Sequence, residues 1–304
     1  MRFSISLPYP SGGNDPAEVD GYLEVARAVE SAGLDAVWVT DHPFPYVEKG
    51  KAGHQAIDPF VLLGFVAAAT ERVGLHVNLI VLPYRNPFLT ARLLGTVDVV
   101  SRGRAIAAVG AGYMRREFDA LGADFERRAA LVEEGVAAMR AAWTGEPVRF
   151  EGEGYRADGN VMLPRPVTSP QPPLWRGGNS RQAIESAARS FDGWAPFEVT
   201  AARSRDTTTS PMDLDVLPGK IALLREAAER EGRSEPLDVC LCRPFPRWLT
   251  DRSQAIEELQ ALAAMGVTWL APQLAGRDAA EQVESVAAFA EVVRHAGVAP
   301  NASG

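Results

Sequence analysis

The sequence predicts an α/β protein: a single (β/α)8 TIM barrel over residues 1–304, with insertions after the fourth helix and the sixth strand. A helix, a glycine and a short strand follow one another four times, at Gly33, Gly74, Gly103 and Gly266. Several strand candidates, such as AIAAV at 105–109, are apolar throughout, which is typical of parallel strands that are covered on both faces. Eight strands alternating with eight helices within about 250–300 residues fit a barrel better than an open sheet.

The predicted elements follow from local patterns. The strands are Phe3–Leu7, Ala36–Thr40, Leu75–Val81, Ala105–Val109, Pro173–Gly177, Gly193–Ala195, Leu237–Cys242 and Val267–Ala271. Apolar residues three and four apart trace the buried face of two helices, at Val132, Val136, Met139 and Trp143 and at Val283, Val286, Ala290 and Val293. We expect a left-handed cap at each of the four glycines. An open Rossmann-like sheet is the alternative, but VGAGYM lacks the third glycine of a dinucleotide-binding motif.

Two long segments do not belong to the repeat. Residues 144–172 are rich in glycine and proline and include VRFEGEGYRADG, which predicts a β-hairpin. Residues 197–218 form a polar stretch after the sixth strand. Because active sites of barrels lie at the carboxyl ends of the strands, we expect this second segment to cover the substrate.

Composition and charge exclude several classes of protein. The net charge of -8 argues against non-specific nucleic-acid binding, and no apolar run approaches the ~18 residues of a membrane span. The N-terminus breaks into proline and glycine before a signal-peptide core can form, so we expect a cytoplasmic protein. Cys240 and Cys242 are predicted to be reduced core thiols. The histidines form no His-x-His pair, so we expect no metal site.

The stretch AVWVTDHPFP places Asp41 and His42 at the end of the second strand, followed by two prolines that prevent a helix. At this rim an imidazole can exchange a proton with a substrate, and a neighbouring carboxylate can select its tautomer. The geometry therefore allows a functional histidine at His42, with Asp41 as the neighbouring carboxylate. The alternative is that Asp41 caps a turn and His42 packs beneath a loop.

Two further turns follow other strands. LWRGGNSRQAIESAAR passes through Gly177 and Gly178 to Asn179 or Ser180 as the N-cap of a helix, so that backbone N–H groups can bind a phosphate with help from Arg176. In GAGYM, Gly110 and Gly112 allow close approach of a ligand. An ordinary helix cap and an ordinary loop are the alternatives.

Together, AVWVTDHPFP, the block from VGLHVNLIVLPYRNP to SRGRAIAAVGAGYM, and PPLWRGGNSRQAIESAARSFDGWAP resemble the luciferase-like monooxygenase superfamily. Within it the chain is most similar to the branch that uses coenzyme F420, a deazaflavin. The resemblance is dense over residues 1–195. It implies an oxidoreductase that transfers a hydride between F420 and an unidentified small organic substrate.

The resemblance also implies a role for particular residues. Asp41 and His42 would contact the deazaflavin ring, and a strand bulge with a non-prolyl cis peptide at or near Asn78–Leu79 would support the back of the ring. Gly110 and Gly112 would lie beside the ribityl chain, and the phosphate would bind at Gly177, Gly178, Asn179 and Ser180. For the implied hydride transfer His42 is our first candidate proton donor, with Asp41 orienting it. Tyr9, Tyr84 and Tyr113 are the alternative donors, whereas Trp194 is expected to pack in the barrel.

Two other functions stay open: an FMN-dependent monooxygenase of the same superfamily, and a non-catalytic barrel that binds a flavin or deazaflavin. The resemblance further implies a homodimer, for which the apolar helix FVLLGFVAAAT at 60–70 could serve unless its surplus faces the barrel. The chain has Arg85-Asn86-Pro87 where many members have Arg-His-Pro. It also has Arg176 at a position that is usually apolar.

Overall fold

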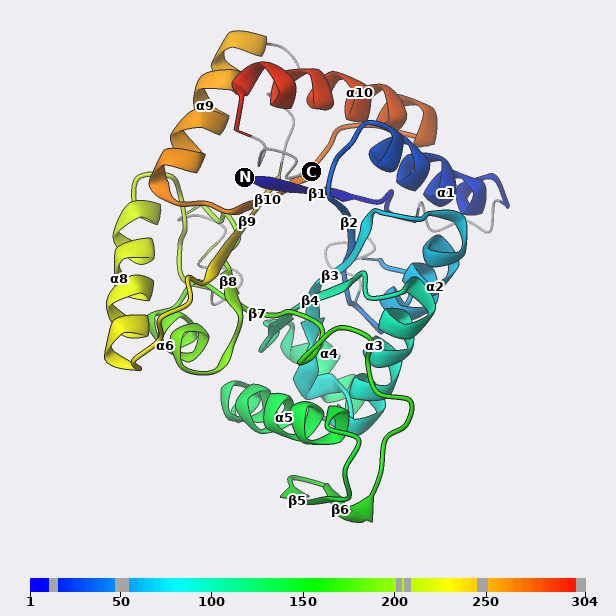
Figure 1. Ribbon diagram of the computed structural model, residues 1–304, viewed down its shortest axis with the longest axis vertical. Coiled ribbons are helices and arrows are strands. Elements are labelled where there is room, and N and C mark those ends of the chain that lie inside the picture. Colours follow the sequence, from blue (N-terminus) through cyan, green and yellow to red (C-terminus); the bar gives the residue numbers. More distant parts are fainter. Residues whose placement is uncertain (11–15, 47–54, 201–203, 205–208, 245–250, 299–304) are drawn as a thin grey trace.

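Eight parallel strands close into a barrel, in the order β1-β10-β9-β8-β7-β4-β3-β2 (Figure 1). The computed structural model of the protein describes residues 1–10, 16–46, 55–200, 204, 209–244 and 251–298. The predicted fold class and each of the eight predicted strands are confirmed, with bounds that differ by no more than two residues. The strands are β1 Arg2–Ser6, β2 Ala36–Val39, β3 Gly74–Val81, β4 Ala105–Gly110, β7 Leu174–Gly177, β8 Gly193–Ala195, β9 Asp238–Pro244 and β10 Trp269–Gln273.

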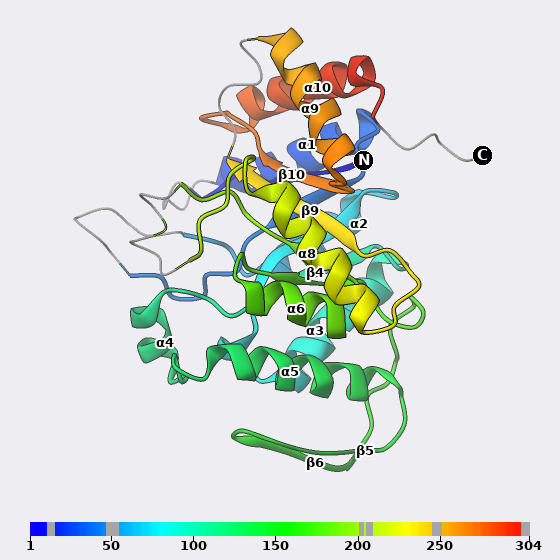
Figure 2. The same cartoon turned by 90° about the vertical axis from the view of Figure 1, so that its left-hand side faces the viewer.

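The helices surround the barrel and cover its outer face (Figures 1 and 2). They are α1 Pro16–Ser31, α2 Pro59–Ala69, α3 Pro87–Ser101, α4 Arg115–Leu121, α5 Arg128–Trp143, α6 Arg181–Ser190, α8 Leu217–Arg230, α9 Arg252–Met265 and α10 Ala279–Ala296, with a short 3-10 helix at Leu82–Tyr84. The predicted buried faces of α5 and α10 are confirmed, because all their stripe residues are buried except Val283, which is half-buried.

Three of the four predicted left-handed glycines are confirmed. Gly33, Gly103 and Gly266 have φ values of 75°, 87° and 103°. The prediction for Gly74 was wrong, because this residue is the first of β3 rather than a helix cap. A Cβ atom at Gly74 would lie 3.1 Å from the Cβ of Ala36, so the glycine is needed for close approach of β2 and β3.

The predicted hairpin is present as β5 Val148–Gly152 and β6 Tyr155–Asn160, which pair in antiparallel fashion. It lies outside the barrel along α5 (Figure 2). The Tyr155 hydroxyl donates a hydrogen bond of 2.8 Å to Glu134 on α5, and the Tyr155 ring packs edge-on against Phe88 on α3. These contacts fix the insertion to two barrel helices.

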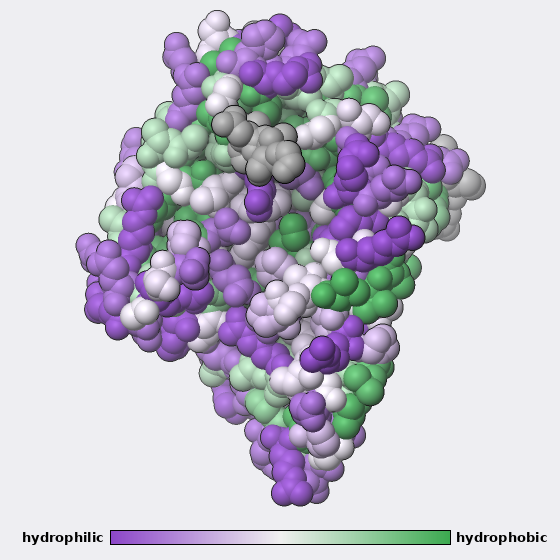
Figure 3. Space-filling view, in the orientation of Figure 1, coloured by the Kyte–Doolittle hydropathy of each residue, from purple (hydrophilic) through white to green (hydrophobic). Residues whose placement is uncertain are grey.

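Apolar side chains occur on both faces of α2. Phe60, Leu63 and Val66 are buried, but Val61 is 68% exposed and Phe65 is 42% exposed. Hydrophobic residues of α2 and α3 form a patch on the side of the molecule seen in Figure 3. Part of the 60–70 segment therefore packs against the barrel, and part of it is exposed and could serve a dimer contact. The homodimer stays a prediction. Among the described residues, no helix is long and apolar enough to cross a membrane.

The barrel interior contains a buried histidine. His76 is fully buried, its Nδ1 lies 3.1 Å from the Ser4 hydroxyl, and its ring packs edge-on against Trp175. Burial lowers the pKa of His76 to about 3, because no water solvates the imidazolium there. The side chain is therefore neutral in the folded protein at every pH near neutrality.

This burial predicts a specific pH dependence of stability. In the unfolded chain His76 binds a proton below its usual pKa, whereas the folded chain resists protonation, so stability falls as the pH decreases from about 6.5 towards 3. Between about pH 7.5 and pH 5, the wild type should lose about 2 kcal/mol more unfolding free energy than His76→Gln. Urea unfolding of both proteins at both pH values measures this difference. Equal losses would contradict the prediction.

Candidate functional site

A cavity of about 590 Å³ opens at the carboxyl ends of the barrel strands. We call it the rim pocket. Its walls come from the segments that follow β1, β2, β4, β7 and β8 and from the last residues of β3, β9 and β10. Every residue that the sequence analysis placed in the site lines this pocket, namely Asp41, His42, Asn78, Leu79, Gly110, Gly112, Arg176, Gly177, Gly178, Asn179 and Ser180. Turns far apart in the sequence thus meet in a single cavity.

Strand β3 forms part of the pocket floor. Its register against β4 shifts between Val77 and Ile80, and the Asn78–Leu79 peptide bond is cis, as the resemblance implied. The Leu79 side chain lies beside Gly110 of β4, where a Cβ atom would be 2.6 Å from Leu79 Cδ1. A Cβ atom on Gly177 of β7 would overlap Leu79 in the same way. These two glycines therefore make room for a side chain of the protein itself.

Glu117 is the carboxylate next to His42. Its Oε2 lies 3.1 Å from Nδ1 of His42 and accepts a 3.0 Å hydrogen bond from the Tyr84 hydroxyl. Its Oε1 accepts a 3.0 Å hydrogen bond from the backbone N–H of Phe44. Burial alone would raise the pKa of Glu117, but these hydrogen bonds lower it below its usual value.

The sequence analysis missed Glu117. It lies in the first turn of α4, a few residues after Gly112. An acidic residue that follows a glycine-containing loop at the carboxyl end of a strand was the available signal.

Asp41 has a different partner from the one we predicted. Its carboxylate is fully buried and accepts two hydrogen bonds from Arg85, of 2.6 and 3.0 Å, and one from the Val81 N–H. We expected it to orient His42, but the carboxylate that the imidazole contacts belongs to Glu117. Successive side chains of an extended segment point in opposite directions, which explains why neighbours in sequence have separate partners.

The Arg85-Asn86-Pro87 variation has a structural explanation. Asn86 is the N-cap of α3, and its side-chain oxygen accepts hydrogen bonds from the N–H groups of Phe88 and Leu89. Pro87 is the first helical residue, where the missing N–H costs nothing. Asparagine at this position therefore stabilises the start of α3.

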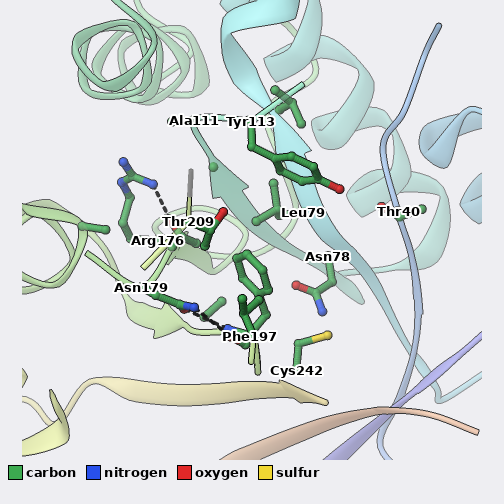
Figure 4. Close-up of a pocket in the computed structure, with 18 of the residues that line it drawn as sticks. Thr40, Asn78, Leu79, Ala111, Tyr113, Arg176, Asn179, Phe197, Thr209 and Cys242 are labelled. Carbon is green, nitrogen blue, oxygen red and sulfur yellow. Dashed lines mark hydrogen bonds between the residues drawn. The ribbon is translucent and has the colours of Figure 1, made fainter. Parts of the chain in front are cut away.

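The turn at 177–180 leads into α6. Gly178 has a φ of 121°, and the Ser180 hydroxyl caps the helix by accepting from the Ala183 N–H. The buried Asn179 side chain donates to the carbonyls of Phe197 (2.8 Å) and Ser210 (3.0 Å) and accepts from the Phe197 N–H (Figure 4). The Asn179 side chain is therefore used within the protein rather than presented to a ligand.

Arg176 is a buried cation beside this turn. The residue is 4% exposed, and its Nη1 donates to the carbonyl of Gly177 (Figure 4). Its Nε has no hydrogen-bond partner among the described residues, and the nearest carboxylate oxygen, on Glu133, is 3.8 Å away. Burial lowers the pKa of Arg176 to about 10, so the guanidinium is still charged at neutral pH. It is suited to bind an anion that enters the rim pocket.

The segment that we expected to cover the substrate contributes part of the wall. Phe197, Glu198, Val199, Thr209 and Ser210 line the rim pocket; residues 201–203 and 205–208 lie outside the described residues. Val199 pairs with Met212 through two backbone hydrogen bonds of 2.9 and 3.0 Å.

The two cysteines have different surroundings. Both thiols are free; Cys240 is buried, whereas Cys242 is half-buried and lies beside Asn78 at the rim pocket (Figure 4). Trp194 is fully buried and donates to the Gly178 carbonyl, which confirms that it packs in the barrel.

Comparison with known proteins gives a consistent result. The model of the family described as luciferase-like monooxygenase matches residues 1–300. An F420-dependent glucose-6-phosphate dehydrogenase of Nakamurella multipartita is 31% identical over 249 residues, which cover 80% of this chain and 68% of the relative.

Two solved structures have the same fold. An F420-dependent secondary alcohol dehydrogenase in complex with an F420-acetone adduct superimposes with a TM-score of 0.77 at 19% identity, covering 97% of this chain and 98% of the other. The oxygenating constituent of 3,6-diketocamphane monooxygenase of Pseudomonas putida, in complex with FMN, gives a TM-score of 0.74 at 16% identity, covering 96% and 98%. At these identities the likeness concerns the fold alone.

The pairing of Asp41 with Arg85 predicts strong coupling between the two residues. Asp41→Asn should lower the unfolding free energy by about 3 kcal/mol, because it leaves a largely buried guanidinium with only the more exposed Asp58 as its counter-charge. Adding Arg85→Met should cost much less than in the wild-type background. Urea unfolding of the single and double variants measures this coupling, with Glu185→Gln in the exposed Arg181–Glu185 pair as the matched control. Additive effects of Asp41→Asn and Arg85→Met would refute the assignment.

Proposed function

Because the chain belongs to the luciferase-like monooxygenase family, we propose that it is an oxidoreductase that transfers a hydride between coenzyme F420 and a small organic substrate. The observation that carries the proposal is that His42 and the 177–180 turn line the same cavity. A ring-containing redox cofactor with an anionic tail needs both a platform and an anion site, and candidate residues for both line the rim pocket.

The anion end fits a phosphate. The N-terminus of α6 offers backbone N–H groups and a positive helix dipole, and Arg176 adds a full charge with an unpaired N–H. Within the Arg176 guanidinium it is the buried Nε that lacks a hydrogen-bond partner among the described residues, and a buried N–H in this state is costly unless a ligand supplies an acceptor. We therefore assign Arg176, Gly177, Gly178, Asn179 and Ser180 to the cofactor tail.

The other end of the pocket fits a flat ring. Asn78 and Leu79 line this end of the pocket, with the Leu79 side chain in the space beside Gly110, and Gly112 continues the wall. When bound there, F420 would supply the hydride. The chain itself would orient the ring, keep water away from its exposed face and hold a proton at His42.

His42 is the proposed proton donor. Its side chain is 9% exposed and lines the rim pocket, so it can reach a substrate while largely shielded from water. For a carbonyl substrate, the imidazole would give its proton to the oxygen as the carbon receives the hydride. Asp41, bound to Arg85, would hold the adjoining backbone in place.

The second candidate function is an FMN-dependent monooxygenase. The FMN-bound P. putida structure superimposes almost as well as the F420-dependent alcohol dehydrogenase, and a phosphate at the 177–180 turn would suit either cofactor. A non-catalytic barrel that binds such a cofactor is the remaining alternative. The F420 proposal is preferred because the relative that is 31% identical is named for that cofactor.

Cofactor titration tests the proposal. Purified protein should bind F420 saturably, as followed by the fluorescence of the cofactor, and should bind FMN at least about tenfold more weakly, a difference of about 1.4 kcal/mol. Tight binding of FMN with no affinity for F420 would favour the monooxygenase instead.

Turnover tests the role of His42. With a panel of secondary alcohols, carbonyl compounds and sugar phosphates, His42→Ala should reduce turnover by about 10²–10⁴ while F420 affinity persists. Binding without turnover for any compound would favour the non-catalytic barrel.

Arg176 should contribute to affinity for the tail. Arg176→Met should weaken cofactor binding by about 10–100-fold, because it removes a charge-assisted hydrogen bond. Arg181→Met is the matched control, since Arg181 lies on the same helix but is exposed and pairs with Glu185. It should change affinity by less than about twofold. Equal effects of the two substitutions would argue against a direct contact with Arg176.

A further inference from the structure

We infer that Glu117 is the positioning residue for His42: its buried carboxylate fixes the imidazole through Nδ1 and stabilises the protonated ring, so that the pair acts as the acid of the site. This inference rests on the proposed function and deepens it. Neither the family resemblance nor the neighbouring carboxylate of Asp41 predicted this pairing.

The surroundings of Glu117 keep it ionised. The side chain is fully buried, yet His42, Tyr84 and the Phe44 N–H all lie at hydrogen-bonding distance from its two oxygens. The Phe44 N–H and the Tyr84 hydroxyl are donors to a carboxylate, and burial raises the pKa of Tyr84 far above neutrality, so its proton stays in place. A carboxylate that accepts several hydrogen bonds favours its charged form.

An ionised Glu117 dictates the state of His42. An acceptor at 3.1 Å requires a proton on Nδ1, which leaves Nε2 as the ring nitrogen that can exchange a proton with a ligand in the rim pocket. The negative charge of Glu117 lies next to the ring, where it favours a protonated imidazole more than an uncharged side chain at position 117 would. For a carbonyl substrate, the N–H bond at Nε2 breaks, an O–H bond forms on the substrate, and a neutral imidazole remains.

Other groups around His42 do not replace this charge. Asp41 adjoins it in sequence, but its carboxylate forms a bidentate pair with Arg85, and the two charges compensate each other. Tyr113 carries no carboxylate and packs edge-on, at 6.2 Å between ring centroids. Among the described residues, Glu117 is thus the carboxylate that contacts the His42 imidazole directly.

An NMR titration of the cofactor-free protein tests the inference. The His42 signal is assigned by its loss in His42→Ala, and its pKa is then compared between the wild type and Glu117→Gln. Replacement of the carboxylate by an amide should lower the His42 pKa by about one unit or more. Tyr84→Phe is the matched control, because it removes a hydrogen bond to Glu117 but keeps the charge; its effect should be below about half a unit.

The titration also shows whether the variants are folded. Unchanged signals of His76 and His295 indicate an intact fold, and Glu117→Asp, which keeps the charge, provides a second variant if Glu117→Gln does not fold. With Glu117→Asp the His42 pKa should stay nearer the wild-type value than with any neutral residue at 117. A His42 pKa that is the same in the wild type and in Glu117→Gln would overturn the inference.

Turnover separates this inference from the proposed function. A protonated His42 is needed for carbonyl reduction, so the rate should fall as the pH rises through the His42 pKa, and in Glu117→Gln this fall should move to lower pH. At neutral pH the variant should lose about 10–100-fold in rate with unchanged cofactor affinity. If the wild type transfers no hydride from F420, the proposed function fails, whereas the NMR shift still decides the role of Glu117. An identical pH profile of turnover in the wild type and in Glu117→Gln would contradict the positioning role of Glu117.

Discussion

The packing of Leu79 against two glycines determines the shape of the rim pocket. The bulge in β3 brings this side chain beside Gly110 of β4 and Gly177 of β7, which are themselves neighbouring strands. Any larger residue at either glycine would push the leucine into the cavity. Leu79 is half-buried and borders the cavity, so its place in the floor depends on glycine at both positions. The turn that we propose as the phosphate site begins at the same Gly177.

Buried charge adds a second constraint at the same rim. Asp41 and Glu117 are both fully buried carboxylates, and a buried carboxylate is tolerated only with a charged or hydrogen-bonding partner. Asp41 meets this need with Arg85, and Glu117 meets it with His42, Tyr84 and a backbone N–H. The two sets of contacts lie on opposite sides of one extended segment. They hold that segment in place although its prolines exclude regular structure.

The barrel and most of the pocket could be predicted from the sequence, because both depend on local patterns. Strand and helix periodicity located the eight barrel strands, and turn residues at their carboxyl ends indicated which segments meet. Partners across the pocket could not be predicted. Glu117 reaches His42 from another element, 75 residues along the chain, and no local spacing reports such a contact.

The prediction for Gly74 failed for a related reason. A glycine between a helix and a strand is compatible both with a left-handed cap and with close strand packing. The position of Ala36 on the adjacent strand decides between these possibilities. The role of Gly74 thus depends on Ala36, a residue far away in the sequence.

Asn179 joins two parts of the site that would otherwise vary independently. Its side chain binds the backbone on both sides of the 201–208 segment, at Phe197 and Ser210, while Lys220 holds its carbonyl oxygen. The backbone that we propose to bind the cofactor tail is therefore tied to a wall of the rim pocket. A change at Asn179 would disturb the proposed anion site and the neighbouring pocket wall together.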